Sequence, residues 1–144
     1  MSVPFMEHPG AEDYFGPVEA MADAIGRLRA LPQWDQWMVF HASGMGHRID
    51  SYHCAHIRMR GNELEIGEPV TLDIPAVTQK ARVPTTLLSP AGNNRYTIAG
   101  ATPEQAAEVL HAIFVLHLGI RGHPDDEHDT EVEEDDYGVG AEWE

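Results

Sequence analysis

Histidine and cysteine are the residues of this chain best suited to chemistry. The 144-residue sequence contains nine histidines and one cysteine, and His41, His47, His53, Cys54 and His56 lie close together. A zinc site needs three or four such donors about 2.0–2.3 Å from one ion. Because neighbouring residues of a strand point to opposite faces, we expect His53 to point away from Cys54 and His56. The sequence therefore predicts no metal site and no cofactor.

A hydrolytic or phosphate-binding site is equally poorly supported. Ser51 and His53 are two residues apart, which on a strand separates their Cβ atoms by about 7 Å, and the Gly-x-Ser-x-Gly elbow of many hydrolases is absent. The turn Gly44-Met45-Gly46 lacks the lysine and the following helix of a phosphate-binding loop. We identify no catalytic residues and favour a non-catalytic protein.

A small α+β domain is predicted to position these side chains. The expected helices begin at Pro17, after the N-cap Asp73, and at the capping box Thr102-Pro103-Glu104-Gln105, and the last of these ends near Gly119. The expected strands are Trp34–Ala42, Ile49–Arg60, Glu63–Ile66 and Arg95–Ala99. The predicted fold is a three-stranded antiparallel meander plus a fourth strand, packed against a long C-terminal helix and an N-terminal helix. Its element order resembles that of the small α+β chaperones of type III secretion, in topology.

The second hairpin has one register that satisfies every residue. With Gly61-Asn62 as the turn, opposite charges face each other at Arg60–Glu63 and Arg58–Glu65, while Met59–Leu64 and Ile57–Ile66 form an apolar face. A shift by one residue would turn every apolar side chain to the wrong face.

The first hairpin leaves an apolar cluster on the outer face. With Gly44-Met45-Gly46 as a three-residue loop, Trp37 and Val39 face the core, and Met38 lies across from Tyr52. The outer face then shows Met38, Phe40, Tyr52, Cys54, His56, Arg58 and Arg60. Either another part of the chain, for example the N-terminal arm with Phe5, Tyr14 and Phe15, covers these aromatic residues, or they form an interaction surface. A two-residue turn would reverse the first strand.

The negative charge is concentrated at the C-terminus. The formal net charge is −15, and residues 123–144 hold eleven of the 24 acidic residues and no lysine or arginine. We therefore expect a single domain over residues 1–122 and an acidic, largely mobile tail over residues 123–144. Tyr137 and Trp143 give this tail an aromatic end that docks either on the same domain or on a partner.

This composition excludes several functional classes. A strongly acidic chain is unsuited to gripping nucleic acid through its phosphates. No run approaches the roughly 20 apolar residues of a membrane span, and the N-terminus has no signal-peptide pattern. One cysteine suits a reducing compartment, so we expect a cytoplasmic protein.

These features favour an acidic protein-binding module, an inhibitor or immunity-type protein that engages a basic partner. Immunity proteins and nucleic-acid mimics share this charge profile, and their partners include nucleases, toxins and nucleic-acid-handling enzymes. The candidate binding residues are Met38, Phe40, Tyr52, His56, Arg58, Arg60, Asp135, Asp136, Tyr137 and Trp143. A chaperone-like homodimer, and a small histidine-dependent enzyme or ligand-binding domain, are the alternatives.

Overall fold

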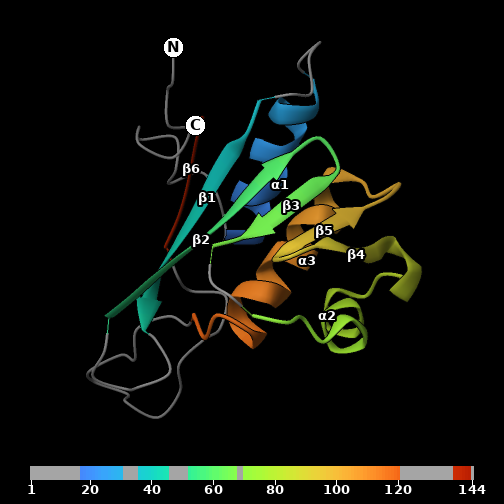
Figure 1. Cartoon of the computed structure of the whole chain (residues 1–144). Coiled ribbons are helices and arrows are strands. Elements are labelled where there is room, and N and C mark those ends of the chain that lie inside the picture. The colour runs from blue at the N-terminus through green and yellow to red at the C-terminus, as the bar shows by residue number, and fades with distance from the viewer. Residues whose placement is uncertain (1–16, 31–35, 46–51, 68–69, 121–137, 144) are drawn as a thin grey trace.

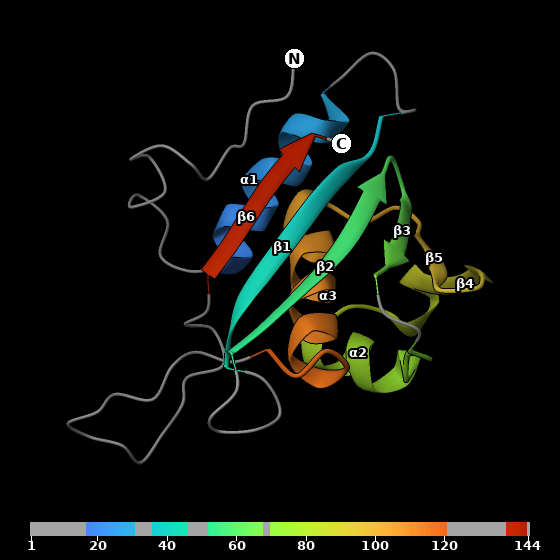
Figure 2. The ribbon, with the colours of Figure 1, turned by 60° about the vertical axis from the view of Figure 1, so that its left-hand side comes forward.

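Six antiparallel strands form one sheet, and helices cover one of its faces (Figures 1 and 2). The computed structural model describes residues 17–30, 36–45, 52–67, 70–120 and 138–143, and the side chains of residues 43–45, 52–54 and 138 are not among the described atoms. The helices are α1 (Pro17–Arg29), α2 (Ile74–Ala81) and α3 (Pro103–Leu116), with a short 3₁₀ helix at Thr85–Leu87. The strands are β1 (Met38–Met45), β2 (Tyr52–Arg60), β3 (Glu63–Ile66), β4 (Leu88–Gly92), β5 (Arg95–Ile98) and β6 (Gly138–Trp143). Their spatial order is β4-β5-β3-β2-β1-β6, which confirms a mixed α+β fold.

The helix boundaries follow the local signals in the sequence. At the start of α3, the Thr102 hydroxyl accepts a hydrogen bond from the Gln105 backbone N–H at 3.1 Å, and the Thr102 N–H donates to Gln105 Oε1 at 3.0 Å. This reciprocal capping satisfies two backbone donors that have no partner within the helix. At α2, the Asp73 side chain alone acts as the cap, accepting a hydrogen bond from the Ala76 N–H at 3.2 Å.

The predicted register of the second hairpin is confirmed. Strands β2 and β3 pair Arg60 with Glu63 and Met59 with Leu64, and the pairing continues to Ile57 and Ile66. Met59 and Leu64 are fully buried, whereas the charged pairs occupy the opposite face. Only two residues, Gly61 and Asn62, separate β2 from β3, so local geometry fixes the register.

The predicted register of the first hairpin is wrong, and the error reverses β1. Phe40 lies opposite Ile57 and Met38 opposite Met59, while Gly44 and Met45 belong to β1 instead of forming the turn. Met38 and Phe40 are therefore 0% exposed and form part of the core. The physical reason is the period of two along a strand: the connection lies at residues 46–51, outside the described residues, and an odd change in register exchanges the two faces.

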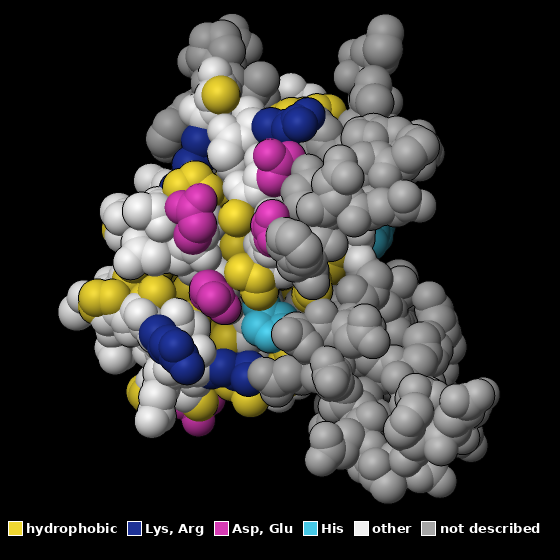
Figure 3. All heavy atoms as spheres, turned by 180° about the vertical axis from the view of Figure 1, so that it is seen from behind, with side chains coloured by type: hydrophobic (Ala, Val, Ile, Leu, Met, Phe, Trp, Pro, Cys, Tyr) yellow, Lys and Arg dark blue, Asp and Glu magenta, His cyan; other side chains and the backbone are white. Residues whose placement is uncertain are grey.

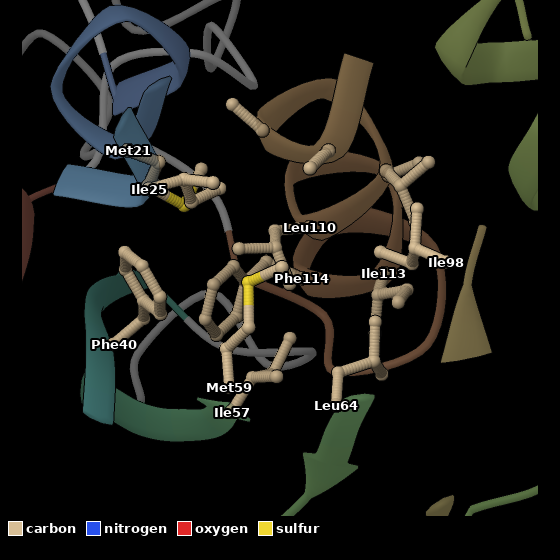
Figure 4. Packing of buried hydrophobic residues seen from close by; sticks show 14 of the residues in the cluster. Met21, Ile25, Phe40, Ile57, Met59, Leu64, Ile98, Leu110, Ile113 and Phe114 are labelled. Atoms are coloured by element: carbon tan, nitrogen blue, oxygen red, sulfur yellow. The ribbon is translucent and has the colours of Figure 1, made fainter. Parts of the chain in front are cut away.

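The core lies between the sheet and the two long helices. Figure 4 shows Phe40 of β1 directed toward α1, and Ile57 and Met59 of β2 directed toward α3. The labelled core residues are Met21, Ile25, Phe40, Ile57, Met59, Leu64, Ile98, Leu110, Ile113 and Phe114, all fully buried. Because α1 and α3 also pack against each other, they form one layer over the sheet.

Two strands are additional to those predicted. β4 contains Pro90 and an irregular register next to it, which is typical of a strand at a sheet edge. β6 pairs with β1 from Met38–Trp143 to Ser43–Gly138, so it forms the other edge.

The aromatic end of the C-terminal segment thus docks on this same domain, one of the two alternatives that the sequence left open. Ala141 of β6 is 2% exposed, and Val139 and Trp143 pack against the core. The expected boundary at residue 122 and the expected mobility of the acidic segment fall on residues 121–137, which lie outside the described residues, as do Asp135, Asp136 and Tyr137.

Trp143 is predicted to contribute to stability although it is the next-to-last residue. Trp143→Ala removes an aromatic side chain that is only partly buried, so we expect a loss of about 2 kcal/mol, below the 3–5 kcal/mol typical of a fully buried tryptophan. Urea denaturation of the two proteins measures this difference.

The neighbouring variant Glu142→Ala is the matched control. Glu142 lies on the opposite face of β6 and forms a partly exposed contact with His41, so its removal should change stability by less than about 1 kcal/mol. Equal effects of the two variants would mean that β6 is not held by its core-facing side chains.

Candidate protein-interaction surface

Trp37 is the aromatic centre of the outer sheet face, the face that does not carry α1 and α3. It immediately precedes Met38, so it points away from the core, and the guanidinium carbons of Arg58 and Arg60 lie 4.4 and 4.5 Å from its ring centroid. Such stacked cations are attracted by the ring quadrupole. The prediction placed Trp37 in the core and Met38 and Phe40 here, and the reversal of β1 exchanges them.

The arginines of this face are held by glutamates of the same sheet. Glu65 accepts hydrogen bonds from Arg58 Nη1 at 2.5 Å and from Arg95 Nε at 2.9 Å, and Glu63 accepts one from Arg60 Nη2 at 3.3 Å. The bonds from Arg58 and Arg95 hold the pKa of the Glu65 carboxyl below its usual range. Arg58 and Arg60 were predicted to rim a binding surface, but their charges are already compensated within the sheet.

Two histidines and one glutamate lie together at the other end of this face. The ring centroids of His41 and His56 are 6.1 Å apart, and His41 Nε2 lies 3.1 Å from Glu142 Oε1. The His56 ring packs against the backbone of Gly67, where an added Cβ would come within 2.6 Å of Nε2. Within the described part of the chain, no group of three or more histidine, cysteine or acidic side chains is placed to hold a metal ion.

The ten predicted binding residues do not form one surface. His56, Arg58 and Arg60 lie on the outer sheet face, Met38 and Phe40 lie in the core, and Trp143 packs against the core. Asp135, Asp136 and Tyr137, and the side chain of Tyr52, lie outside the described residues, although the backbone of Tyr52 pairs with Met45 and not with Met38.

The helical side of the molecule carries a groove that the sequence analysis did not anticipate. This acidic groove, as we call it, lies between α1 and α3 and has a volume of about 810 Å³. Its lining combines uncharged residues (Val18, Ala22, Gly26, Ala30 and Pro103) with charged ones (Glu19, Asp23, Arg27, Glu104 and Glu108). Figure 3, which views the molecule from the side opposite to Figure 1, shows acidic side chains around a strip of hydrophobic ones.

Small side chains on α1 create this groove. Val18, Ala22, Gly26 and Ala30 follow one another at intervals of four residues, so they form one inclined row on the helix surface. A Cβ added at Gly26 would meet no atom within 4 Å, so packing within the described structure does not require a glycine there. Glycine in a helix interior costs about 1 kcal/mol relative to alanine. The residue therefore weakens α1 while it keeps the groove open.

Arg29 fixes the end of α1 against the start of α3. Its Nη1 donates to the carbonyl oxygen of Ala101, the residue before the N-cap Thr102, and its Nη2 donates to Asn62 Oδ1 at 3.3 Å in the turn between β2 and β3. Partial burial lowers the pKa of Arg29. These contacts set the position of Ala30 and Pro103, which line one end of the groove.

Charge distinguishes the acidic groove from the outer sheet face. Among the described residues, four carboxylates line the groove (Glu19, Asp23, Glu104 and Glu108) against one arginine, Arg27, which pairs with Asp23 at 3.1 Å. On the sheet face, three arginines meet Glu63 and Glu65 in direct contacts. The groove is therefore strongly negative, whereas the sheet face is nearly balanced. In the sequence, the signal for this groove was the repeat of small residues at intervals of four beside Glu19 and Asp23.

A second cavity, of about 610 Å³, lies between the segment before α2 and the turn that joins β4 to β5. Its described lining carries no charged side chain, and its tyrosine, Tyr96, accepts a hydrogen bond from the Leu72 N–H at 3.1 Å through its hydroxyl oxygen.

In the described residues, no helix has the length and apolar character needed to cross a membrane.

The Glu65 contacts predict a specific pH dependence of stability. Because its native pKa is lowered, the carboxylate stabilises the fold above the unfolded-state pKa of about 4.3, and this contribution is lost as the pH falls through the lowered native value. The difference in unfolding free energy between the wild type and Glu65→Gln should therefore be largest near neutral pH and shrink in acid. Urea denaturation at several pH values measures it, and a difference independent of pH would contradict the assignment.

Comparison with known proteins finds no match to a protein-family model, to a curated protein or to a solved structure. Neither the fold nor a relative therefore indicates an activity for this chain. The features of the surface that can indicate a function are its charges. They are compensated on the sheet face and predominantly negative in the groove between α1 and α3.

Proposed function

We propose that this protein is a non-catalytic binding module whose acidic groove engages a basic segment of a partner protein. The observation that carries the proposal is the excess of four carboxylates over one arginine around an apolar strip between α1 and α3. Apolar contact area surrounded by charged groups is the usual anatomy of a protein interface. The partner class that fits is a protein with an exposed basic surface, for example a nuclease, a toxin or another nucleic-acid-handling enzyme.

The net charge of the whole chain also supports binding of a basic partner. A net charge of −15 attracts a basic protein from beyond contact distance and raises the association rate at low ionic strength. An inhibitor or immunity protein needs fast and selective capture of this kind, which is why we place the chain in that class. One cysteine, which cannot form an internal disulfide, further suits a cytoplasmic site of action.

The two alternative functions have less support. Among the described residues, no histidine lines the acidic groove or the second cavity, so neither of them supports chemistry centred on His41 and His56. A homodimer joined at the groove would bring two strongly negative surfaces together, and like charges in an interface oppose association.

Neutralising the groove should weaken partner binding. The variant with Glu19→Gln, Asp23→Asn, Glu104→Gln and Glu108→Gln removes all four carboxylates while it keeps their shapes. We expect its affinity for a basic partner, isolated with the wild-type protein and identified by mass spectrometry, to fall by about 10-fold or more at low salt. Titration of the purified pair by calorimetry measures the change, and circular dichroism verifies that the variant folds.

A control variant of equal net charge separates the effect of the groove from the effect of the overall charge. The control replaces Asp125, Asp126, Glu127 and Asp129 by their amides, so both variants change the net charge from −15 to −11. The control should keep nearly all of the affinity. If both variants lose the same amount, the groove has no special role, and if neither does, the proposed function is wrong.

A further inference from the structure

We infer that the second cavity is a binding site for an uncharged, planar small molecule with a cyclic-amide edge, the chemistry of a nucleobase. The cavity lies where the segment before α2 meets the turn between β4 and β5, and α2 and β4 lie on the same side of the molecule (Figure 1). It shares no described lining residue with the acidic groove. The inference therefore goes beyond the proposed function, and either of them can fail without the other.

The size and the walls of this cavity suit a small molecule. Its volume of about 610 Å³ falls within the range of about 300–1,000 Å³ that is typical of ligand pockets. Val70, Leu72, Ile74 and Pro90 supply aliphatic surface, and no described lining residue is charged. A ligand with a phosphate or carboxylate would lose hydration here without meeting an opposite charge. The described lining therefore favours an uncharged ligand with an apolar face.

The hydroxyl of Tyr96 retains a hydrogen that it can donate to a ligand. Tyr96 is 7% exposed, and its oxygen accepts the hydrogen bond from the Leu72 N–H at 3.1 Å. A phenol hydroxyl accepts and donates at the same time, and no acceptor among the described residues takes its hydrogen. Because a buried donor without an acceptor costs free energy, this position favours an acceptor within the cavity. A carbonyl oxygen of a bound molecule supplies one.

Two carboxamides line the same cavity. Asn93 and Asn94 belong to the turn between β4 and β5, and neither side chain forms a hydrogen bond to another described residue. A carboxamide presents one acceptor beside one donor, and a cyclic amide does the same, so the two can pair through two hydrogen bonds. The φ of 57° at Asn94 is one that glycine also adopts, so the turn itself does not require a carboxamide there.

Uridine and N3-methyluridine are the matched probes. Uridine is uncharged, and its base carries an N–H between two carbonyl groups. Methylation at N3 removes this donor and keeps the ring and the sugar. In calorimetric titrations of the full chain, we expect saturable binding of uridine with a Kd below about 1 mM. N3-methyluridine should bind at least about 10-fold more weakly, because its edge leaves a carboxamide oxygen without a donor.

The double variant Asn93→Ala, Asn94→Gly removes both carboxamides without straining the turn. Glycine adopts the positive φ of position 94, and Asn93 has no positive φ, so Tm should change by less than about 3 °C. The affinity for uridine should fall by at least about 10-fold. The control Gln79→Ala removes an exposed carboxamide of α2 outside the cavity and should keep the affinity within about 2-fold. Asparagines that served only the turn would not produce a loss of binding at unchanged stability.

Side-chain amide signals locate the bound probe. The chain has three asparagines, and Asn62 lies beside the other end of β5, where its carbonyl oxygen accepts from the Ile98 N–H at 2.7 Å. In ¹H–¹⁵N spectra, uridine should shift the NH₂ resonances of Asn93 and Asn94 and leave those of Asn62 in place.

Four results would overturn the inference. They are the absence of saturable uridine binding, equal binding of the two probes, unchanged affinity of the double variant, and shifts at Asn62 without shifts at Asn93 and Asn94. None of them bears on the proposed function, which the variants of the acidic groove test separately.

Discussion

The burial of Phe40 is the constraint on which the rest of this structure depends. Phe40 lies opposite Ile57 and Ala141 in the two neighbouring strands, and all three are buried. Because side chains alternate along a strand, this one orientation directs Trp37 and His41 to the outer face. It also turns the core-facing side of β6, with Ala141 and Trp143, toward the helices. A strand reversed at this position would place a tryptophan in the core and leave β6 with no apolar surface to cover.

As a result, the sheet face and the helical face differ in how far their charges are compensated by neighbouring residues. On the sheet face, Arg58 and Arg60 stack on Trp37 and pair with Glu65 and Glu63, so bringing in a partner would replace contacts that already exist. These partly exposed pairs leave little uncompensated charge on the sheet face to recruit another protein. On the helical face, the carboxylates of α1 and α3 gather without an equal number of cations.

Local signals were predictable from the sequence, and contacts between distant segments were not. The capping of α3 by Thr102 and Gln105, and the pairing of β2 with β3, depend on residues a few positions apart. The register of β1 depends on the length of its connection to β2, and one residue more or less exchanges its faces. The acidic groove requires α1 to lie against α3, some 80 residues later, so the repeat of small residues on α1 does not reveal it without that long-range contact. The β6 partner is similarly remote, since Gly138–Trp143 pairs with Met38–Ser43.

Because β6 belongs to the sheet, most of the acidic C-terminal residues lie in the sequence between two elements of the fold. Residues 123–137 carry nine carboxylates, and the described chain on either side, ending at Ile120 and resuming at Gly138, belongs to the folded body. The charge of these residues belongs to the net charge of −15 and adds to the long-range attraction of the chain for a cationic protein. Salt screens that attraction within about 10 Å, whereas contacts from which a bound partner excludes water are screened much less. Under the proposed function, capture and recognition are therefore separable: the net charge of the chain governs how fast a basic protein arrives, and the groove between α1 and α3 governs which one remains.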